Sequence, residues 1–345
     1  MTVAVVGAGV IGAAVAGALA DNGATVTLID PRPRSGASWL AGGMLAPVTE
    51  AWPGEEALLA LGTESLRRWP DFAARLAGRG HDPGLRTEGT LVAAVDSADR
   101  AELTGLADFL ATLDRKVDVL TGRELRALEP SLGPAVRGGL SVPGDLAVDN
   151  RRLLDALLAT AKADHVPVAA TAVRPGSVDL ADGRTVMADV VVLAAGAWSA
   201  GLHPALHGVI RPVKGEILRC CCRTGSLPPP GRTVRGLVEG RHVYLVPRDD
   251  GVVVGATQYE AGFEPGPRVG GIRDLLADAE LLVPGLADYV LAEAAAGFRP
   301  GSPDNLPVVR WLEPGVLAAT GHGRNGILLL PGTVAKVTEL IREAR

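Results

Sequence analysis

The segment at residues 3–30 restricts the fold of this chain more than any other. Residues 3–7 (VAVVG) form a short β-rich run, and residues 10–19 are small and apolar, as in a closely packed helix. Asn22-Gly23 ends that helix, and residues 25–30 (TVTLID) form a second β-rich run. This order predicts a β-α-β unit of about thirty residues.

A glycine motif joins the first predicted strand to the helix. Gly7, Gly9 and Gly12 match GxGxxG, in which the glycines permit a tight turn, close approach of a pyrophosphate and close helix packing. The free N–H groups at the helix start favour phosphate. Asp30 ends the second strand, where a carboxylate accepts hydrogen bonds from ribose hydroxyls and repels the 2′-phosphate of NADP. We therefore predict a site for NAD or FAD; the alternative is a purely structural glycine turn.

The segment after Asp30 favours FAD over NAD. Residues 31–50 (PRPRSGASWLAGGMLAPVTE) are rich in Gly, Ala and Ser and offer little to a core. An NAD-binding domain usually continues its β-α alternation directly. Small residues let a backbone lie along an extended cofactor, although a flexible loop is the alternative. The strand at 190–198 also ends in small residues, as expected beside the same cofactor.

The remaining pattern predicts a discontinuous α/β fold. Predicted helices lie at 55–79, 98–113, 150–163, 271–282 and 326–343, and predicted strands at 90–95, 166–173, 190–198 and 316–321, with an antiparallel sheet between 213 and 260. We predict an FAD-binding Rossmann-type domain from residues 1–50, 145–212 and 300–345. A substrate domain with a mixed or antiparallel sheet and helices would contain residues 51–144 and 213–299.

Composition disfavours several other classes of protein. The formal net charge is −5 and the basic residues are scattered, whereas a nucleic-acid surface needs clustered Lys and Arg. The apolar N-terminus lacks a basic leader, and Asp21 interrupts it before the roughly 20 residues that span a bilayer. Cys220, Cys221 and Cys222 are consecutive, which predicts neither a disulfide nor a metal site. We expect a cytoplasmic protein without nucleic-acid or membrane partners.

Eight segments occur in an order that is typical of one group of flavoproteins. They are GAGVIG at 7–12, SWLAGGMLAP at 38–47, AAGAWS at 194–199, RPVKGE at 211–216, YLVPR at 244–248, VVGAT at 253–257, GFRPGSPDNLPVV at 297–309 and GHGRNGILLLPGT at 321–333. From about residue 2 to residue 340 the chain resembles the D-amino acid oxidase superfamily. It is more closely similar to the branch that oxidises glycine for thiamine biosynthesis, to which the AGGML and GHxRNGI patterns are specific.

The resemblance implies a two-domain fold that binds FAD non-covalently, with an antiparallel sheet over the flavin ring. The implied reaction oxidises glycine or another small amine to the imine, with O2 as electron acceptor and hydrogen peroxide as product. Water then releases glyoxylate and ammonia, unless the imine passes to thiazole formation. A sarcosine, proline or D-amino acid oxidase or dehydrogenase of the same superfamily is the alternative, and a homo-oligomer stays open.

The resemblance also assigns residues to the site. Arg299 matches an arginine that clamps the substrate carboxylate, Tyr244 a tyrosine that assists it, and Arg324 a second arginine near substrate and flavin. A helix beginning at residues 325–328 would aim its N-terminus at the flavin. The cofactor-binding residues implied are Gly7, Gly9, Val10, Ile11, Gly12, Asp30, Pro31, Ala37, Ser38, Gly42, Gly43, Met44, Val173, Gly196, Trp198, His322, Gly323, Asn325, Gly326, Ile327 and Leu328. A surface arginine at 299 and a half-buried core tyrosine at 244 are the alternatives.

We predict no general base for this reaction. If the amine is already deprotonated when hydride leaves the α-carbon, orientation and electrostatics supply the catalysis. His242 and His322 lie beside site residues, but no catalytic role is predicted for either. Gly323 stands where relatives often carry an aromatic residue, and Gln258 where some carry methionine. These departures would change the size and polarity of the pocket.

Overall fold

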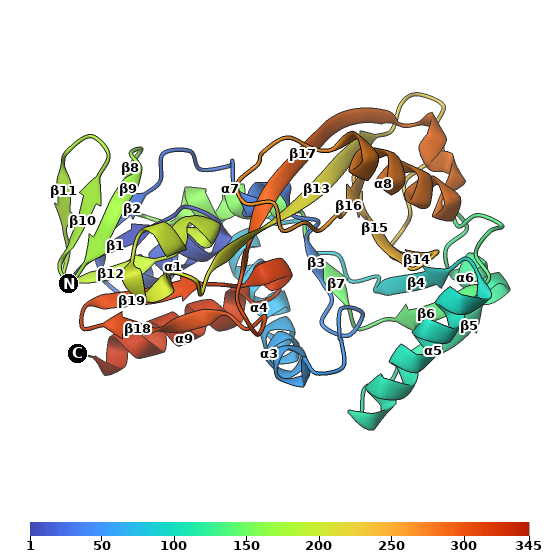
Figure 1. Ribbon diagram of the computed structural model, residues 1–345, viewed down its shortest axis with the longest axis horizontal. Helices are drawn as coiled ribbons and strands as arrows, with labels where there is room; N and C mark the ends of the chain where they lie inside the picture. The colour runs from blue at the N-terminus through green and yellow to red at the C-terminus, as the bar shows by residue number, and fades with distance from the viewer. Residues whose placement is uncertain (345) are drawn as a thin grey trace.

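Two β-sheets lie toward opposite ends of an elongated molecule (Figure 1). The computed structural model describes residues 1–344. In the first sheet the strand order is β18 (Val308–Glu313), β19 (Val316–Thr320), β12 (Val190–Leu193), β1 (Thr2–Val6), β2 (Thr25–Ile29) and β8 (Asp164–Val166). In the second it is β17 (Val290–Gly301), β13 (Arg211–Cys221), β16 (Gly251–Gly255), β15 (Arg241–Arg248), β14 (Thr233–Val238), β4 (Thr90–Ala94), β6 (Gly138–Val142) and β5 (Asp118–Thr121).

The first sheet contains the predicted β-α-β unit, which is confirmed. Strand β1 pairs in parallel with β2 and with β12, and helix α1 (Val10–Asp21) begins four residues after β1 ends. Val3 and Val5 pack with α1, α7 (Asn150–Thr160) and α9 (Leu330–Glu343) in one core cluster. Ala4 and Val6 belong to a separate cluster. Because alternate side chains enter different cores, β1 is an uninterrupted apolar run.

A small antiparallel sheet supplies the second of these cores. It consists of β9 (Ala170–Arg174), β10 (Ser177–Leu180) and β11 (Thr185–Met187). Val173, Val178 and Leu180 pack with Ala4 and Val6 of β1. A turn at Pro175-Gly176 joins β9 to β10, and Gly176 has a φ of +78° there.

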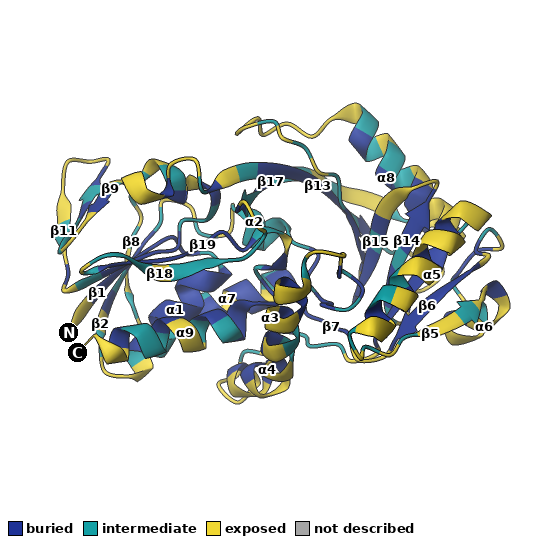
Figure 2. Cartoon of the chain, turned by 60° about the horizontal axis from the view of Figure 1, so that its bottom comes forward, coloured by how far each residue is buried: buried dark blue, intermediate teal, exposed yellow. Residues whose placement is uncertain are grey.

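The second sheet confirms the strands predicted between 213 and 260. Strands β13, β16, β15 and β14 pair antiparallel in that order, and Cys220 and Cys221 are strand residues. Helix α8 (Val269–Leu282) packs against this part of the sheet, with Leu275, Ala279 and Leu282 in its core. Helix α5 (Ser97–Thr112) packs against β4 and β6. Figure 2 shows buried positions concentrated on the strands, while α5 keeps an exposed face.

Strands β13 and β17 pair over their whole length and run through the middle of the molecule (Figure 1). Strand β17 was not predicted, because Ala-rich residues 292–296 have no strand pattern and Arg299-Pro300-Gly301 is typical of a turn. Pro300 is accommodated because β17 is the edge strand of its sheet, where a missing N–H is tolerated.

Two further predictions differ from the structure. The strand predicted at 166–173 is divided into β8 and β9, which belong to different sheets. The helical stretch 55–79 is divided at Arg68 into α3 (Glu56–Arg67) and α4 (Trp69–Ala77). Although this stretch was assigned to the substrate domain, Trp69 is fully buried in the core of the first sheet, and α3 contacts α9. Helices α3 and α4 thus pack with the first sheet, and the domain boundary at residue 51 stays a prediction. Within residues 1–344, no helix has the length and apolar character needed to cross a membrane.

Candidate active site

A cavity of about 1550 Å³ lies between the two sheets and receives residues from both. Small-molecule sites commonly occupy roughly 300–1,000 Å³, so this cavity has room for a dinucleotide together with a small substrate. One end is lined by the glycine turn after β1 and by the segment that follows β2. The other end, called the substrate end below, is lined by β14, β15, β17 and the turn before α9.

The glycine turn has no space for larger side chains. Gly7 has a φ of +103°, and a Cβ there would overlap the carbonyl oxygen of Ala194. A Cβ on Gly12 would overlap the carbonyl oxygen of Gly7, because the helix lies directly against the turn. Gly9 faces Ser38, whose Oγ accepts a hydrogen bond from the N–H of Val10 at 3.1 Å. The turn thus opens the start of α1 to the cavity, as phosphate binding requires.

Asp30 holds this turn in place. Its two carboxylate oxygens accept hydrogen bonds from the N–H of Ala8 at 2.7 Å and from the N–H of Arg32 at 2.8 Å. Each oxygen keeps a second lone pair. Asp30 also lines the cavity, so the same carboxylate is available to ribose hydroxyls while it supports the turn.

The segment after β2 is fixed rather than loose. It includes the short helix α2 (Ala37–Leu40) and strand β3 (Met44–Leu45), which pairs with β7 (Leu146–Ala147). The side-chain amide of buried Asn150 donates to the carbonyls of Ser38 and Trp39, both at 2.9 Å. Buried Arg248 donates to the carbonyl of Gly42 at 2.8 Å. Asn150 and Arg248 were not predicted as site residues, because the carbonyls of residues 38–42 that they hold lie far away in the sequence.

These features fit FAD. The cavity runs from the glycine turn and Asp30, past Ser38 and Gly42, to the sheet that carries Tyr244. A Cβ on Gly42 would lie 2.7 Å from Cε2 of Tyr244, so the backbone there is closely enclosed. Small residues Gly196 and Ala197 line the same cavity from the end of β12. A long, glycine-lined channel of this kind suits an extended dinucleotide.

Arg299 lies on β17 and lines the cavity. Its Nη1 donates to the carbonyl of Thr257 at 3.1 Å. Gly215, on the paired strand β13, leaves room for the guanidinium, which any Cβ there would overlap. Among residues 1–344, no carboxylate forms an ion pair with Arg299. Its charge is therefore available to an anionic ligand.

Tyr244 also reaches the cavity, from β15. Its ring lies between Gly42 and Gly255, and a Cβ on either glycine would collide with it. Burial raises the pKa of the Tyr244 hydroxyl, although the positive charge of Arg299 opposes this shift. The hydroxyl is consequently protonated at neutral pH and can donate a hydrogen bond.

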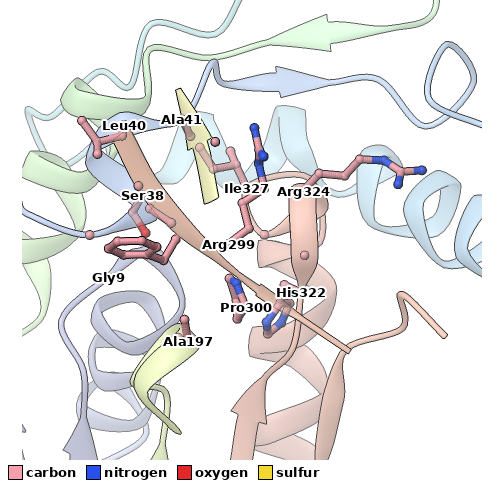
Figure 3. A pocket seen from close by; sticks show the side chains of 18 of the residues that line it. Gly9, Ser38, Leu40, Ala41, Ala197, Arg299, Pro300, His322, Arg324 and Ile327 are labelled. Atoms are coloured by element: carbon pink, nitrogen blue, oxygen red, sulfur yellow. The ribbon is translucent and has the colours of Figure 1, made fainter. Parts of the chain in front are cut away.

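Arg324 lines the cavity but is bound to carboxylates. Its Nη2 lies 2.7 Å from Oε2 of Glu55 and donates to the carbonyl of Glu50 at 3.1 Å. In Figure 3 its side chain extends away from Arg299. The structure thus brings both predicted arginines to one cavity, but only Arg299 is without an ion-pair partner there.

The last helix was predicted to begin at residues 325–328, and this prediction is wrong. Gly323–Asn325 form a 3-10 turn, residues 326–329 continue as turns, and α9 begins only at Leu330. The carbonyl of Leu328 accepts hydrogen bonds from Ser65 Oγ at 2.7 Å and from Trp69 Nε1 at 3.0 Å. These tertiary contacts satisfy a carbonyl that a longer helix would have bonded internally.

Both histidines near the site are held neutral. Burial lowers the pKa of His322 to about 4, and its Nε2 lies 3.0 Å from Oγ1 of Thr333. Burial also lowers the pKa of His242, which contacts the ring of Trp52 edge-on at 5.3 Å between ring centroids. Neither contact is that of a general base oriented by a carboxylate.

Most predicted site residues line the cavity, but five do not. Those that line it are Gly7, Gly9, Val10, Ile11, Asp30, Pro31, Ala37, Ser38, Gly42, Met44, Gly196, Trp198, Tyr244, Arg299, His322, Gly323, Arg324, Gly326 and Ile327. Those that do not are Gly12, Gly43, Val173, Asn325 and Leu328. Val173 is 3% exposed in the core, and its N–H donates to the carbonyl of Leu202 at 3.0 Å. Gly12 and Gly43 act through close packing against backbone.

Several charged residues at the substrate end were missed, including Arg241 and Asp278 as well as the three discussed next. Glu50, Glu55 and Arg235 line the cavity, and Oε1 of Glu50 lies 3.0 Å from Nη1 of Arg235. Glu50 stands three residues after the SWLAGGMLAP segment, which is a weak signal for it. Nothing in the sequence around Arg235 indicates a site residue, because only the register of β14 against β15 brings it opposite Tyr244.

Comparisons with known proteins agree with this geometry. A family model described as FAD dependent oxidoreductase matches residues 2–340. The bifunctional protein ThiO/ThiG of Nostoc sp. is 32% identical, over 99% of this chain and 53% of that protein. The chain thus spans about half the length of the bifunctional relatives that it matches.

Other relatives match over nearly their whole length. Glycine oxidase of Pseudomonas putida is 32% identical, over 99% of this chain and 94% of that protein. The crystal structure of glycine oxidase from Geobacillus kaustophilus superposes with a TM-score of 0.87 at 32% identity, covering 99% of this chain and 94% of the other.

Proposed function

Because the chain belongs to the FAD dependent oxidoreductase family, we propose that it oxidises the amine of glycine or of another small amino acid. Glycine would lose a hydride from its α-carbon and a proton from its nitrogen to form an imine, which water converts to glyoxylate and ammonia. The observation that carries this proposal is Arg299, an arginine without an ion pair in a cavity that also contains the glycine turn. The near-full-length similarity to glycine oxidases supports the choice of substrate.

The residues of the chain have separable tasks in this reaction. When bound, FAD supplies an acceptor for the hydride. Arg299 would bind the substrate carboxylate through two N–H groups, which fixes both the position and the orientation of the α-carbon. The protonated hydroxyl of Tyr244 would donate a third hydrogen bond to the same carboxylate.

The rest of the site would favour an uncharged amine. His242 and His322 have lowered pKa values and are neutral near pH 7, so neither adds positive charge to the cavity. A deprotonated amine can release hydride without a protein base, and the chain then needs only to orient the substrate. The residues that would hold FAD include Gly7, Gly9 and Asp30.

The cofactor would be bound without a covalent link. None of Cys220, Cys221 and Cys222 lines the cavity, and all three thiols are free. We further propose O2 as the electron acceptor, with hydrogen peroxide as product, and a cytoplasmic location. We also propose that the imine can pass to thiazole formation; the similarity to a putative thiamine biosynthesis oxidoreductase ThiO of Rhizobium etli supports a role in thiamine biosynthesis.

Three measurements test the proposal. Acid precipitation of the purified protein should release FAD into the supernatant. Anaerobic glycine should then bleach the flavin absorbance near 450 nm of the intact protein, and readmitted O2 should restore it with one peroxide per turnover. A panel of glycine, sarcosine, D-alanine and D-proline ranks the substrates. Flavin that stays oxidised with every amine would contradict amine oxidation.

A further inference from the structure

The substrate end of the cavity has more arginines than one carboxylate needs. Four arginines lie there, and three of them are paired with carboxylates: Arg235 with Glu50, Arg241 with Asp278, and Arg324 with Glu55. Within residues 1–344, Arg299 alone of the four has no ion pair. Of these four arginines, Arg299 is therefore the one whose charge is left for the carboxylate of glycine.

Glu50 has a central place in this arrangement. Its Oε1 lies 3.0 Å from Nη1 of Arg235, and its Oε2 lies 4.0 Å from Nε of Arg324. The side chains of Glu50 and Arg235 are only 14% and 13% exposed, so solvent screens their charges weakly. One carboxylate thus compensates Arg235 and also acts on Arg324.

Arg235 is well placed to bind a second anionic group if Glu50 were absent. It lies on β14 directly opposite Tyr244 on β15, and opposite residues of paired strands project from the same face of a sheet. Arg235 and Glu50 also line the same cavity as Tyr244 and Arg299. Nη1 of Arg235 is buried without an aligned hydrogen-bond acceptor, so it can take another.

We propose that Glu50 is a specificity-determining residue that restricts the site to substrates with one carboxylate. This proposal rests on the proposed oxidation of small amino acids. A second carboxylate would meet the negative charge of Glu50 and an Arg235 whose charge is already compensated. Specificity of this kind comes from repulsion of the wrong ligand as well as attraction of the right one.

Glu50→Gln tests the proposal because glutamine keeps the shape and removes the charge. The first probes are acetate and malonate, which carry one and two carboxylates and cannot be oxidised here. Titration of the FAD-loaded protein, followed by the flavin difference spectrum, yields a dissociation constant for each. We expect the preference for malonate over acetate to rise at least tenfold in Glu50→Gln. Adding Arg235→Gln to that variant should abolish the gain.

Glu56→Gln is the matched control, because Glu56 is exposed, lies on the same segment and does not line the cavity. It should leave the ratio of the two dissociation constants unchanged. If Glu50→Gln does not fold, Arg235→Gln examines the same claim from the other side. The uncompensated carboxylate of Glu50 should then weaken malonate binding at least fivefold more than acetate binding.

Turnover provides an independent reading. The kcat/KM for iminodiacetate, a secondary amine with two carboxylates, should rise about tenfold relative to that for glycine in Glu50→Gln. If no amine reduces the flavin of any variant, the proposed function fails, while the acetate and malonate titrations still decide the role of Glu50. An unchanged malonate preference in a folded Glu50→Gln protein, or no response to either carboxylate, would overturn the specificity proposal.

Discussion

Replacing Arg299 with lysine separates a carboxylate clamp from a simple positive charge. The guanidinium of Arg299 lines the cavity, donates to the carbonyl of Thr257 at 3.1 Å and has space created by Gly215. Lysine would preserve the charge but would offer a single ammonium in place of two parallel N–H groups. The substitution therefore removes the two parallel hydrogen bonds and keeps the positive charge.

The expected loss follows from the character of the site. Breaking a hydrogen-bonded charge pair in a desolvated site costs about 2–5 kcal/mol. At about 1.4 kcal/mol for each factor of ten, kcat/KM for glycine should fall roughly 30-fold or more. FAD content should stay normal, because Arg299 lies at the end of the cavity away from the glycine turn.

Steady-state peroxide production at varied glycine concentration measures the loss. Benzoate or glycolate should perturb the flavin spectrum of the wild type and fail to do so in Arg299→Lys. Arg310→Lys is a suitable control, since Arg310 is exposed on β18 and does not line the cavity. If Arg299→Lys retains near-normal efficiency and still responds to both ligands, Arg299 does not clamp the carboxylate.

Three further changes have distinct expected outcomes. Asp30→Ala should reduce FAD retention on dialysis without raising the glycine KM of the flavin-loaded fraction, because Asp30 supports the glycine turn; a large KM effect with full flavin content would contradict this placement. Gly255→Ala should displace the ring of Tyr244 and raise the glycine KM about as much as Tyr244→Phe; an unchanged KM would show that the hydroxyl does not bind substrate. The buried, neutral His322 has a pKa of about 4 against 6.5 in a free side chain, so the unfolded chain binds more protons between those values and stability falls as pH drops from about 6.5 to 4. Urea unfolding at pH 7 and pH 5 should therefore show a smaller loss of unfolding free energy in His322→Gln than in the wild type. Buried Asp145, with a pKa raised to about 7, has the opposite pH dependence, but it is present in both proteins and cancels in the comparison. Equal losses would refute the assignment to His322.

The sequence was sufficient for features that depend on neighbours along the chain. The β-α-β unit at residues 3–30 was predicted correctly because strand, turn and helix follow one another, and the helix packs on the strands that flank it. Gly7 and Gly12 could be interpreted for the same reason, since each contacts backbone of the same unit or of its parallel neighbour. The family resemblance added Arg299 and Tyr244, whose surroundings contain no local pattern for a binding site.

Features that depend on contacts between distant segments could not be predicted in this way. Strand β17 has an Ala-rich sequence and becomes a strand because β13 satisfies its backbone hydrogen bonds. The late start of α9 depends on Ser65 and Trp69, which bind the carbonyl of Leu328 from more than 250 residues away. Arg235 and Glu50 are 185 positions apart in the sequence, and only the packing of the residue-50 segment beside β14 makes them an ion pair. The sequence shows that a residue is charged. Whether that charge is paired depends on which oppositely charged residue the tertiary structure places within a few ångströms.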